Sequence, residues 1–371
     1  MIYMDYNATT PIAPEVAAAM QPFITDWFGN PSSTHEHGVK AKTALDAARN
    51  QVASLIGAKP GEILFTSGGS EANNTVLKGV AHTHSAKGRH IIISQIEHPA
   101  IQKPCEFLER NGYRITRLPV DRDGIVSVRD LEKAFSTDTI LVSVMHANNE
   151  TGSIQPIAEI GALCRQRGIL FHTDASQSVG KIPVNVQDMN VDFLTIAGHK
   201  LYAPKGIGAL YIRDGLIIEP LIHGAGQETG RRAGTENIIF DVALGKACEL
   251  ARGLPDMARI GSLTEKLYAG IRRAFGDRVK INGHPTLRLP NTLFISFFGQ
   301  TLGELQSALG DTAVSTGSAC HSHSAELSPV LQAMGTATNR PFTAIRFSLG
   351  RYTTEKEVDT VLERLSSMTQ S

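Results

Sequence analysis

Lys200 and Asp174 are the first residues whose types and positions suggest chemistry. Lys200 follows an apolar run in Ala197-Gly198-His199-Lys200, and Asp174 ends another in Phe171-His172-Thr173-Asp174. A partly desolvated lysine has a lowered pKa and forms a Schiff base with a carbonyl group. A carboxylate can pair with a protonated pyridine nitrogen and keep that ring an electron sink. A surface lysine and a helix-capping aspartate are the ordinary alternatives, but the two residues together favour pyridoxal phosphate.

A candidate phosphate site lies in Ser67-Gly68-Gly69-Ser70, between an apolar run and an expected helix. Backbone N–H groups at the start of a helix attract an anion. Such turns are frequent, so the signal is weak by itself. The segment matches neither GxGxxG nor GxxxxGK[ST], which argues against a dinucleotide or ATP. His199, beside Lys200, is a further candidate donor to the same phosphate.

Four more polar residues follow or alternate with apolar runs. His98, in Glu97-His98-Pro99, is placed to stack on a cofactor ring and move protons, or it is a structural histidine. Gln177 suits the phenolic oxygen of the cofactor, and Asn148 suits substrate or cofactor. Arg346, in a strand-like segment, suits a substrate carboxylate; an internal salt bridge is the alternative.

Cys320 stands in a segment of small and polar residues, Ser315-Thr316-Gly317-Ser318-Ala319-Cys320-His321-Ser322-His323-Ser324. These neighbours predict an exposed loop, and the two histidines would help to form the thiolate, which is the nucleophilic state. Most lone cysteines are inert packing residues, and Cys-x-His is a minor metal signal. The other cysteines, Cys105, Cys164 and Cys248, form no CxxC pair. The sequence therefore predicts no metal site.

The elements that must position these residues follow from short apolar runs that alternate with helical segments. The predicted strands are 63–66, 91–94, 140–144, 169–172, 193–196 and 208–212, and the predicted helices start near Glu71, after Pro99 and at Ile157. Continuous apolar runs of this kind indicate a mostly parallel sheet covered on both faces. Ligands gather beyond the carboxyl ends of the strands in such α/β sheets. The candidate residues follow those ends.

A second, smaller α+β domain is predicted after about residue 255. Residues 236–276 have the pattern of one long amphipathic helix, 291–298 of a strand, 314–320 of a strand end or loop, 344–349 of a strand, and 354 onward of a closing helix. Two domains are the natural expectation for a chain of 371 residues.

The composition excludes several classes of protein. The 36 basic residues balance the 36 acidic residues, so no net field attracts nucleic acid or an anionic membrane. No apolar run approaches the roughly 18 residues that cross a bilayer, and the N-terminal residues show no export signal. Scattered cysteines indicate reduced thiols. We therefore expect a cytoplasmic enzyme.

Taken together, these motifs resemble the cysteine desulfurase family, which consists of fold-type I pyridoxal-phosphate enzymes. The resemblance covers nearly the whole chain, from Asp5-Tyr6-Asn7-Ala8-Thr9-Thr10-Pro11 to Ser348-Leu349-Gly350-Arg351, and includes Asn148-Asn149-Glu150-Thr151-Gly152 and Gly317-Ser318-Ala319-Cys320. It implies an α/β fold with a mostly parallel seven-stranded sheet in a large cofactor-binding domain, residues 15–255. Residues 1–14 and 256–371 would form the small domain with the catalytic cysteine loop.

The resemblance also implies a role for each candidate. Lys200 would bear the cofactor, Asp174 would pair with the pyridinium nitrogen, and Gln177 with the phenolic oxygen, while His98 would stack on the ring and act as acid and base. The phosphate would be held by Gly69, Ser70 and His199, and by Thr235 of the neighbouring subunit in a homodimer with shared sites. Asn148, a cofactor contact as well, and Arg346 would bind the substrate carboxylate.

Cys320 would attack the sulfur of L-cysteine, which leaves alanine and a persulfide for an acceptor protein in iron–sulfur cluster assembly or tRNA thiolation. Ala197 departs from the pattern, because many members have a phosphate-binding serine there, and Ser70 replaces the usual threonine. Other segments, such as Gly234-Thr235-Glu236-Asn237, are also similar to selenocysteine lyases, so L-selenocysteine is an alternative substrate. An aminotransferase, another C–S lyase and a non-catalytic scaffold for iron–sulfur assembly are less favoured alternatives.

Overall fold

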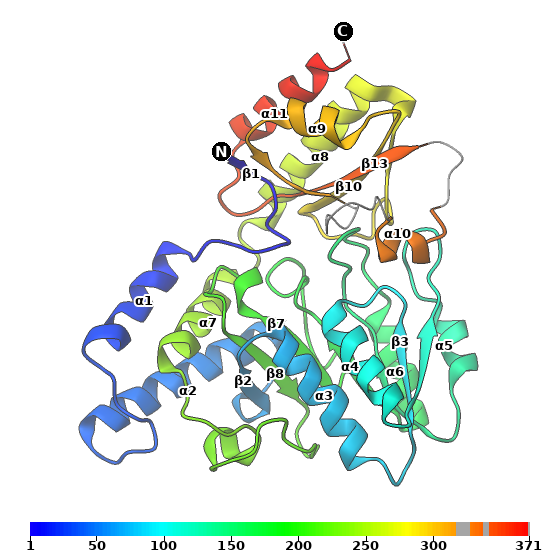
Figure 1. Cartoon of the computed structure of the whole chain (residues 1–371). Coiled ribbons are helices and arrows are strands. Elements are labelled where there is room, and N and C mark those ends of the chain that lie inside the picture. The colour runs from blue at the N-terminus through cyan, green and yellow to red at the C-terminus, as the bar shows by residue number, and fades with distance from the viewer. Residues whose placement is uncertain (317–326, 337–340, 370–371) are drawn as a thin grey trace.

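The computed structural model describes residues 1–316, 327–336 and 341–369. They form two layered bodies, each built on its own main sheet. The larger body, in the lower part of Figure 1, contains a seven-stranded sheet, and the smaller one above it contains a four-stranded sheet.

The large sheet is mostly parallel, as the apolar runs predict. Its strands are β2 (Ile63–Thr66), β3 (His90–Ser94), β4 (Arg114–Leu118), β5 (Thr139–Ser143), β6 (Leu170–Asp174), β7 (Phe193–Ala197) and β8 (Gly208–Ile212), in the order β2-β8-β7-β6-β5-β3-β4. Only β8 is antiparallel to its neighbours. The sequence pattern missed β4, because this edge strand alternates arginines with apolar residues and is only partly buried.

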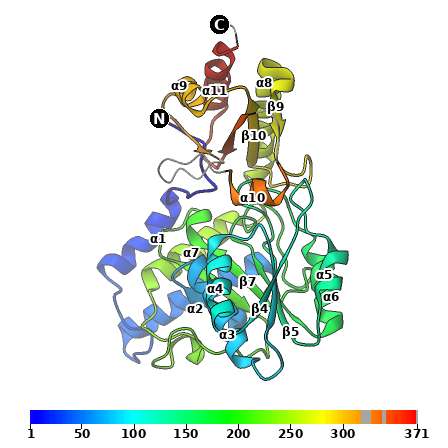
Figure 2. The same cartoon turned by 45° about the vertical axis from the view of Figure 1, so that its right-hand side comes forward.

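Helices cover both faces of this sheet (Figures 1 and 2). They are α1 (Pro14–Thr25), α2 (Glu36–Ile56), α3 (Gly69–Thr83), α4 (Pro99–Arg110), α5 (Val128–Ala134), α6 (Ile157–Arg167) and α7 (Ile238–Ala251). Alternate strand residues supply opposite cores: Leu194 packs with α2, α6 and α7, whereas Phe193 packs with α3 and α4. Burial on both sides explains why the strands are continuously apolar.

The smaller body has a four-stranded sheet in the order β12-β13-β10-β9, with antiparallel pairing throughout. Its strands are β9 (Val279–Ile281), β10 (Thr292–Phe298), β12 (Ser315–Thr316) and β13 (Phe342–Ser348), and its helices are α8 (Met257–Phe275), α9 (Leu302–Leu309), α10 (Pro329–Ala333) and α11 (Glu355–Ser367). The described residues also form short 3-10 turns, namely η1 (Pro60–Glu62), η2 (Gly198–Lys200), η3 (Gln227–Gly230) and η4 (Gly276–Arg278).

The N-terminal segment connects the two bodies. Strand β1 (Ile2–Tyr3) pairs with β11 (Thr312–Ala313) beside the smaller sheet. The chain then runs past the carboxyl edge of the large sheet, and α1 packs on α7 of the larger body. This path places residues 5–10 between the bodies (Figure 2).

The prediction of one long helix over residues 236–276 is wrong. Helix α7 ends at Ala251 and α8 begins at Met257. Gly253 and Leu254 between them have positive φ angles of 75° and 55°, a region that interrupts a right-handed helix. Pro255 also disfavours helical geometry at Leu254. The apolar pattern continues across the break because Leu254 and Pro255 contribute to a small cavity between the bodies.

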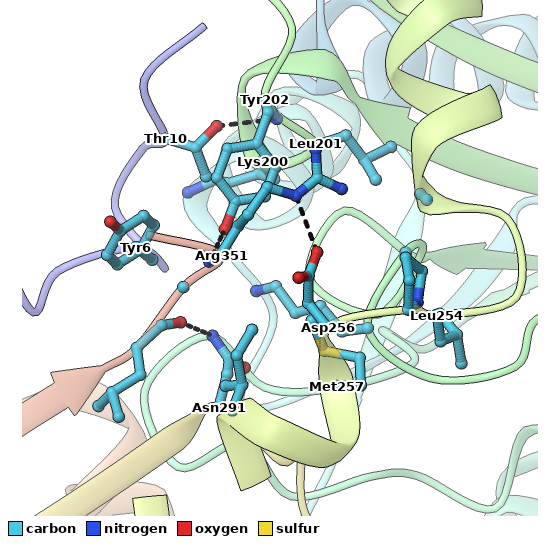
Figure 3. Close-up of a pocket in the computed structure, with 17 residues that line it drawn as sticks. Tyr6, Thr10, Lys200, Leu201, Tyr202, Leu254, Asp256, Met257, Asn291 and Arg351 are labelled. Carbon is cyan, nitrogen blue, oxygen red and sulfur yellow. Dashed lines mark hydrogen bonds and ion pairs between the residues drawn. The ribbon is translucent and has the colours of Figure 1, made fainter. Parts of the chain in front are cut away.

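Polar contacts connect the two bodies next to this break. The Arg351 Nε atom lies 2.8 Å from Asp256 Oδ2, and the Arg351 N–H donates to the Tyr202 hydroxyl at 2.7 Å. The Tyr202 N–H in turn donates to Thr10 Oγ1 at 2.9 Å. Figure 3 shows these groups together, with contributions from the N-terminal segment, the large body and the small body.

Among the described residues, no helix has the length and apolar character needed to span a bilayer. The same residues contain no cluster of three histidine, cysteine or carboxylate side chains suited to a metal ion.

Two helical glycines should respond in opposite ways to alanine substitution. A Cβ at Gly245 in α7 would lie 2.6 Å from the Cα of Ala48 in α2, whereas a Cβ at Gly261 in α8 meets only Pro290, at 3.6 Å. We expect Gly245→Ala to lower the free energy of unfolding by about 1–3 kcal/mol through overpacking. Gly261→Ala should raise it by about 0.5–1 kcal/mol through helix propensity. Urea denaturation of both variants tests the pair, and equal effects would contradict the packing of α2 on α7.

Candidate active site

A cavity of about 400 Å³ lies at the carboxyl edge of the large sheet, beside the smaller body. The sequence predicted chemistry at this edge. The structure brings most of the predicted site residues to its wall: Gly69, Ser70, His98, Asp174, Gln177, Ala197, His199, Lys200 and Arg346. Most of these residues lie at the carboxyl ends of β6 and β7 or in the segments that directly follow β2, β3, β6 and β7, and β13 of the smaller body supplies Arg346.

Lys200 ends the η2 turn that follows β7. Its Nζ atom donates to the backbone carbonyls of Asn7 and, at 2.8 Å, Ala8 in the N-terminal segment. Burial, reinforced by the nearby Arg346 cation, lowers the pKa of Lys200 to about 8. A substantial fraction of the amine is therefore neutral near physiological pH and able to attack a carbonyl.

Asp174 is fixed at the end of β6 by two donors. Its Oδ2 accepts from Asn73 Nδ2 at 2.8 Å, and its Oδ1 accepts from the Ser176 N–H at 2.9 Å. The carboxylate is 8% exposed and lines the cavity. The sequence pattern did not identify Asn73 as a site residue. Asn73 lies one helical turn after Gly69 in α3, on the same side of the helix, and this spacing was the signal that could have identified it.

Both histidines in the described part of the cavity wall have pKa values below the ordinary value for histidine. His98 caps α4, and its Nδ1 accepts from the Ala100 N–H at 3.1 Å, which leaves the proton of the neutral ring on Nε2. Burial lowers the pKa of His98. It also lowers the pKa of His199 to about 4, with the Lys200 cation adding to the effect. The structural role of His98 as a cap and its place at the cavity are compatible.

The N-terminus of α3 forms a cradle for an anion. The helix begins at Gly69, without a side-chain cap, after Gly68 with a φ angle of 148°. A Cβ at Gly69 would lie 3.5 Å from the Ala197 Cβ and take up space in the cradle. Unpaired N–H groups at such a helix start are suited to phosphate.

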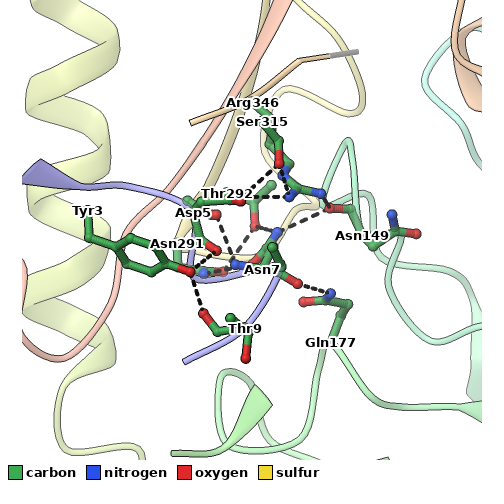
Figure 4. Close-up of polar contacts among 12 residues, drawn as sticks. Tyr3, Asp5, Asn7, Thr9, Asn149, Gln177, Asn291, Thr292, Ser315 and Arg346 are labelled. Atoms are coloured by element: carbon green, nitrogen blue, oxygen red, sulfur yellow. Dashed lines mark hydrogen bonds and ion pairs between the residues drawn. The ribbon is translucent and has the colours of Figure 1, made fainter. Parts of the chain in front are cut away.

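Gln177 belongs to a hydrogen-bond network that the sequence pattern missed (Figure 4). Its Nε2 donates to the Asn7 carbonyl at 2.9 Å, and its Oε1 accepts from Lys181 Nζ at 2.8 Å. Lys181 also donates to Asn7 Oδ1 at 3.0 Å. Burial, with the nearby Lys200 and Arg346 cations, lowers the pKa of Lys181 well below its usual value. Because Lys181 donates to Gln177 Oε1, the amide nitrogen of Gln177 is the end that donates to Asn7. Lys181 follows Gln177 by four residues, and this spacing was the signal in the sequence that could have identified it.

Arg346 forms the internal salt bridge that was the alternative interpretation of its position. Its Nη2 lies 2.7 Å from Asp5 Oδ1 and 2.8 Å from Ser315 Oγ, and its Nη1 donates to the Asn149 carbonyl at 2.8 Å (Figure 4). The buried Nε has no partner among the described residues. Arg346 therefore lines the cavity while one of its donors stays unused.

Two predicted residues, Asn148 and Thr235, are not in the described cavity wall, and a third falls on a segment that the structure does not describe. Asn148 is fully buried in its loop, where its Oδ1 accepts from the N–H groups of Glu150 and Thr151 at 2.9 and 3.0 Å; Asn149 lines the cavity instead. Thr235 is exposed and lines a separate hollow of about 250 Å³. Cys320 lies outside the described residues.

The cavity has the functional groups that pyridoxal 5'-phosphate requires. A lysine with a lowered pKa, a fixed carboxylate and a glycine-lined helix start all face one space. The cofactor needs a carbonyl partner, a pyridinium partner and a phosphate site. The residues present therefore fit this group.

Comparisons with known proteins agree with this geometry. Residues 2–361 match the family model described as aminotransferase class-V. The chain is 49% identical, over 98% of its length and 93% of the relative's, to a protein from Dictyoglomus turgidum named cysteine desulfurase IscS. A solved structure titled NifS-like protein superposes with a TM-score of 0.91 at 37% identity and covers 100% of this chain and 99% of its own. A structure titled SspA in complex with cysteine gives 0.85 at 38% identity, covering 95% and 100%.

Replacing Arg346 by glutamine should raise the pKa of Lys200 above about 8, because the Arg346 cation helps to lower it and Asp5 would be left unpaired. A protonated amine cannot attack, so below the midpoint each unit of increase slows the reaction with pyridoxal phosphate about tenfold. The pH dependence of that rate, followed by absorbance on cofactor-stripped protein, measures the midpoint. Arg346→Lys keeps the charge and should keep the wild-type midpoint, whereas an unchanged midpoint in Arg346→Gln would contradict this electrostatic role.

Proposed function

The chain belongs to the class-V aminotransferase family and, within it, to the cysteine desulfurases, and we therefore propose that it converts L-cysteine to L-alanine and transfers the sulfur to Cys320. The observation that carries this proposal is the shared cavity of Lys200, Asp174 and Arg346. It combines an amine, a pyridinium partner and a cation for the substrate carboxylate.

The chain's own residues have separate tasks in this reaction. Pyridoxal 5'-phosphate, the cofactor of this family, supplies an electron sink when bound, and Asp174 would hold its ring nitrogen while Lys200 attaches its carbonyl carbon. Lys200 or His98 would take the α-proton of cysteine. The Cys320 thiolate would attack the substrate sulfur; the carbon–sulfur bond breaks, and its electron pair stays with carbon. Protonation of that β-carbon and return of the proton to the α-carbon yield alanine. The extra sulfur atom remains on Cys320 as a persulfide.

The three cysteines in the described part of the chain are unsuited to attack the substrate sulfur, which supports the assignment of that role to Cys320. Cys105, Cys164 and Cys248 are all buried, and burial raises the pKa of Cys105 and of Cys248 to about 12. A thiolate is needed for attack on sulfur, so these three thiols are unfit for it. The described chain reaches Ser315, bonded to Arg346 at the cavity, five positions before Cys320.

The substrate carboxylate would be bound at Arg346, with the Asn148–Asn149 loop beside it. The unpaired Nε of Arg346 supports this assignment, because a buried N–H without a partner is costly until a ligand satisfies it. We expect the carboxylate to compete with the Asp5 and Asn149 contacts for the rest of the guanidinium.

The protein would work as a homodimer with shared sites and deliver its sulfur to an acceptor protein, such as an iron–sulfur scaffold or a tRNA-thiolation enzyme. The exposure of Thr235, outside its own cavity, supports a role in a neighbouring subunit. We also propose the cofactor-binding domain at 15–255 and the small domain at 1–14 and 256–371. The unpaired cysteines are consistent with a cytoplasmic location.

Replacing Cys320 by alanine should abolish alanine and sulfide production from L-cysteine, by at least about a thousandfold, because no other described thiol can accept the sulfur. Cofactor absorbance should be unchanged. Cys248→Ala, which removes a buried thiol, is the matched control and should keep activity. Full sulfur release by Cys320→Ala would refute the role of Cys320, and turnover of L-selenocysteine alone would assign the chain to the selenocysteine lyases.

Mixed dimers test the shared site. If Thr235 serves the partner, a dimer of one Lys200→Ala subunit and one Thr235→Val subunit contains one fully wild-type site and one doubly altered site. Its intact site should bind pyridoxal phosphate with wild-type affinity, at one cofactor per dimer, whereas the Thr235→Val homodimer should bind several-fold more weakly. Cofactor titration of differently tagged, purified dimers measures this. A mixed dimer as weak as the Thr235→Val homodimer would assign Thr235 to its own subunit.

A further inference from the structure

We propose that the Ser176 hydroxyl binds the cofactor phosphate and replaces the hydroxyl that is missing at Ala197. This inference rests on the proposed function, since it concerns how the same cavity holds pyridoxal phosphate. The family resemblance described in the sequence analysis implies a phosphate-binding serine at position 197, where this chain has alanine. The question is which donor of this chain takes over that contact.

Ser176 and Ala197 occupy equivalent register positions at the carboxyl ends of two neighbouring parallel strands, Ser176 after β6 and Ala197 at the end of β7. Asp174 in β6 pairs with Thr195 in β7, so Ser176 and Ala197 each follow this pair by two residues. Both line the cavity. A hydroxyl moved from position 197 to position 176 therefore stays at the same edge of the sheet.

Both side chains also face the same point on α3. An ideal Cβ at Gly69 would lie 3.2 Å from Ser176 Oγ and 3.5 Å from the Ala197 Cβ. Gly69 is the first residue of α3, where unpaired N–H groups attract phosphate. The Ser176 hydroxyl is thus at the anion cradle.

The Ser176 hydroxyl is available to a ligand. It forms no hydrogen bond with another described residue, whereas the Ser176 N–H is held by Asp174 Oδ1 at 2.9 Å. The hydroxyl of Ser178, two residues further on, is used by the protein: it bonds to His146 and to the Ala175 carbonyl. The backbone contact fixes Ser176 in place while its side chain remains unused.

A neutral donor such as the Ser176 hydroxyl is important for phosphate binding because the cations in the described part of the cavity wall are bound to other groups. His199 is uncharged near neutral pH, because burial and the Lys200 cation lower its pKa to about 4, and its Nδ1 contacts Thr9 at 3.2 Å. The two cations in the described cavity wall are engaged elsewhere, Lys200 with the N-terminal segment and Arg346 with Asp5. The phosphate therefore depends on neutral donors, namely the start of α3, hydroxyl groups and an N–H of His199.

The experiment compares the binding of pyridoxal phosphate and of pyridoxal, which lacks the phosphate, to the cofactor-stripped protein. Ser176→Ala should raise the Kd for pyridoxal phosphate about tenfold or more, as loss of a hydrogen bond to a charged group does. The Kd for pyridoxal should not change. Ala197→Ser should have little effect in the wild type but restore most of the affinity in Ser176→Ala, because it returns the hydroxyl to the neighbouring position.

The outcomes separate this inference from the proposed function. Unchanged affinity in Ser176→Ala, an equal loss for both ligands, or no rescue by Ala197→Ser would overturn the role of Ser176 alone. A wild-type protein that binds no pyridoxal phosphate would instead overturn the proposed function. Unaltered melting temperatures of the stripped variants confirm that the comparison concerns the site.

Discussion

The backbone and side chain of Asn7 connect nearly every part of the site. Its carbonyl accepts from Gln177 and Lys200 of the large body, and its side chain bonds to Lys181 of the same body. From the smaller body, Thr292 accepts from its Nδ2 at 2.8 Å, and Asn291 donates to its Oδ1 at 3.0 Å. Asn7 is 1% exposed, so these bonds form away from competing water. Asn7 therefore helps to hold together the two bodies that supply Lys200 and Arg346.

Burial also determines the charge states of the site. Lys181 is buried, and the hydrogen-bond partners of its Nζ atom within the described chain are the neutral oxygens of Asn7 and Gln177. A buried ammonium without a carboxylate is costly, and deprotonation is the usual response. Arg346 keeps its charge and is paired with Asp5. The site thus has one permanent cation at the end where a substrate carboxylate would bind, and an amine at Lys200 that can become neutral.

The sequence was informative where function depends on the end of a buried strand. The residues after β2, β6 and β7 could be predicted to meet because parallel strands end at one edge, and they line one cavity. Asn7, Asp5 and Lys181 could not be identified in this way, because their partners are distant in sequence or buried behind the first layer of side chains. The break between α7 and α8 was missed for a similar reason: Leu254 continues the apolar pattern, although it fills the seam between two bodies.

The contacts of Ser315 connect substrate binding to the segment that contains Cys320. Its hydroxyl donates to Asp5 Oδ1 and accepts from Arg346 Nη2, each at 2.8 Å. Ser315 belongs to β12, the last described strand before that segment, and is paired with Arg346 of β13. An anion that takes the Nη2 donor of Arg346 must change the balance among Arg346, Asp5 and Ser315, because the three groups share these bonds. The anchor proposed for the substrate and the base of the cysteine segment are therefore held by one set of interactions, so their positions are not independent.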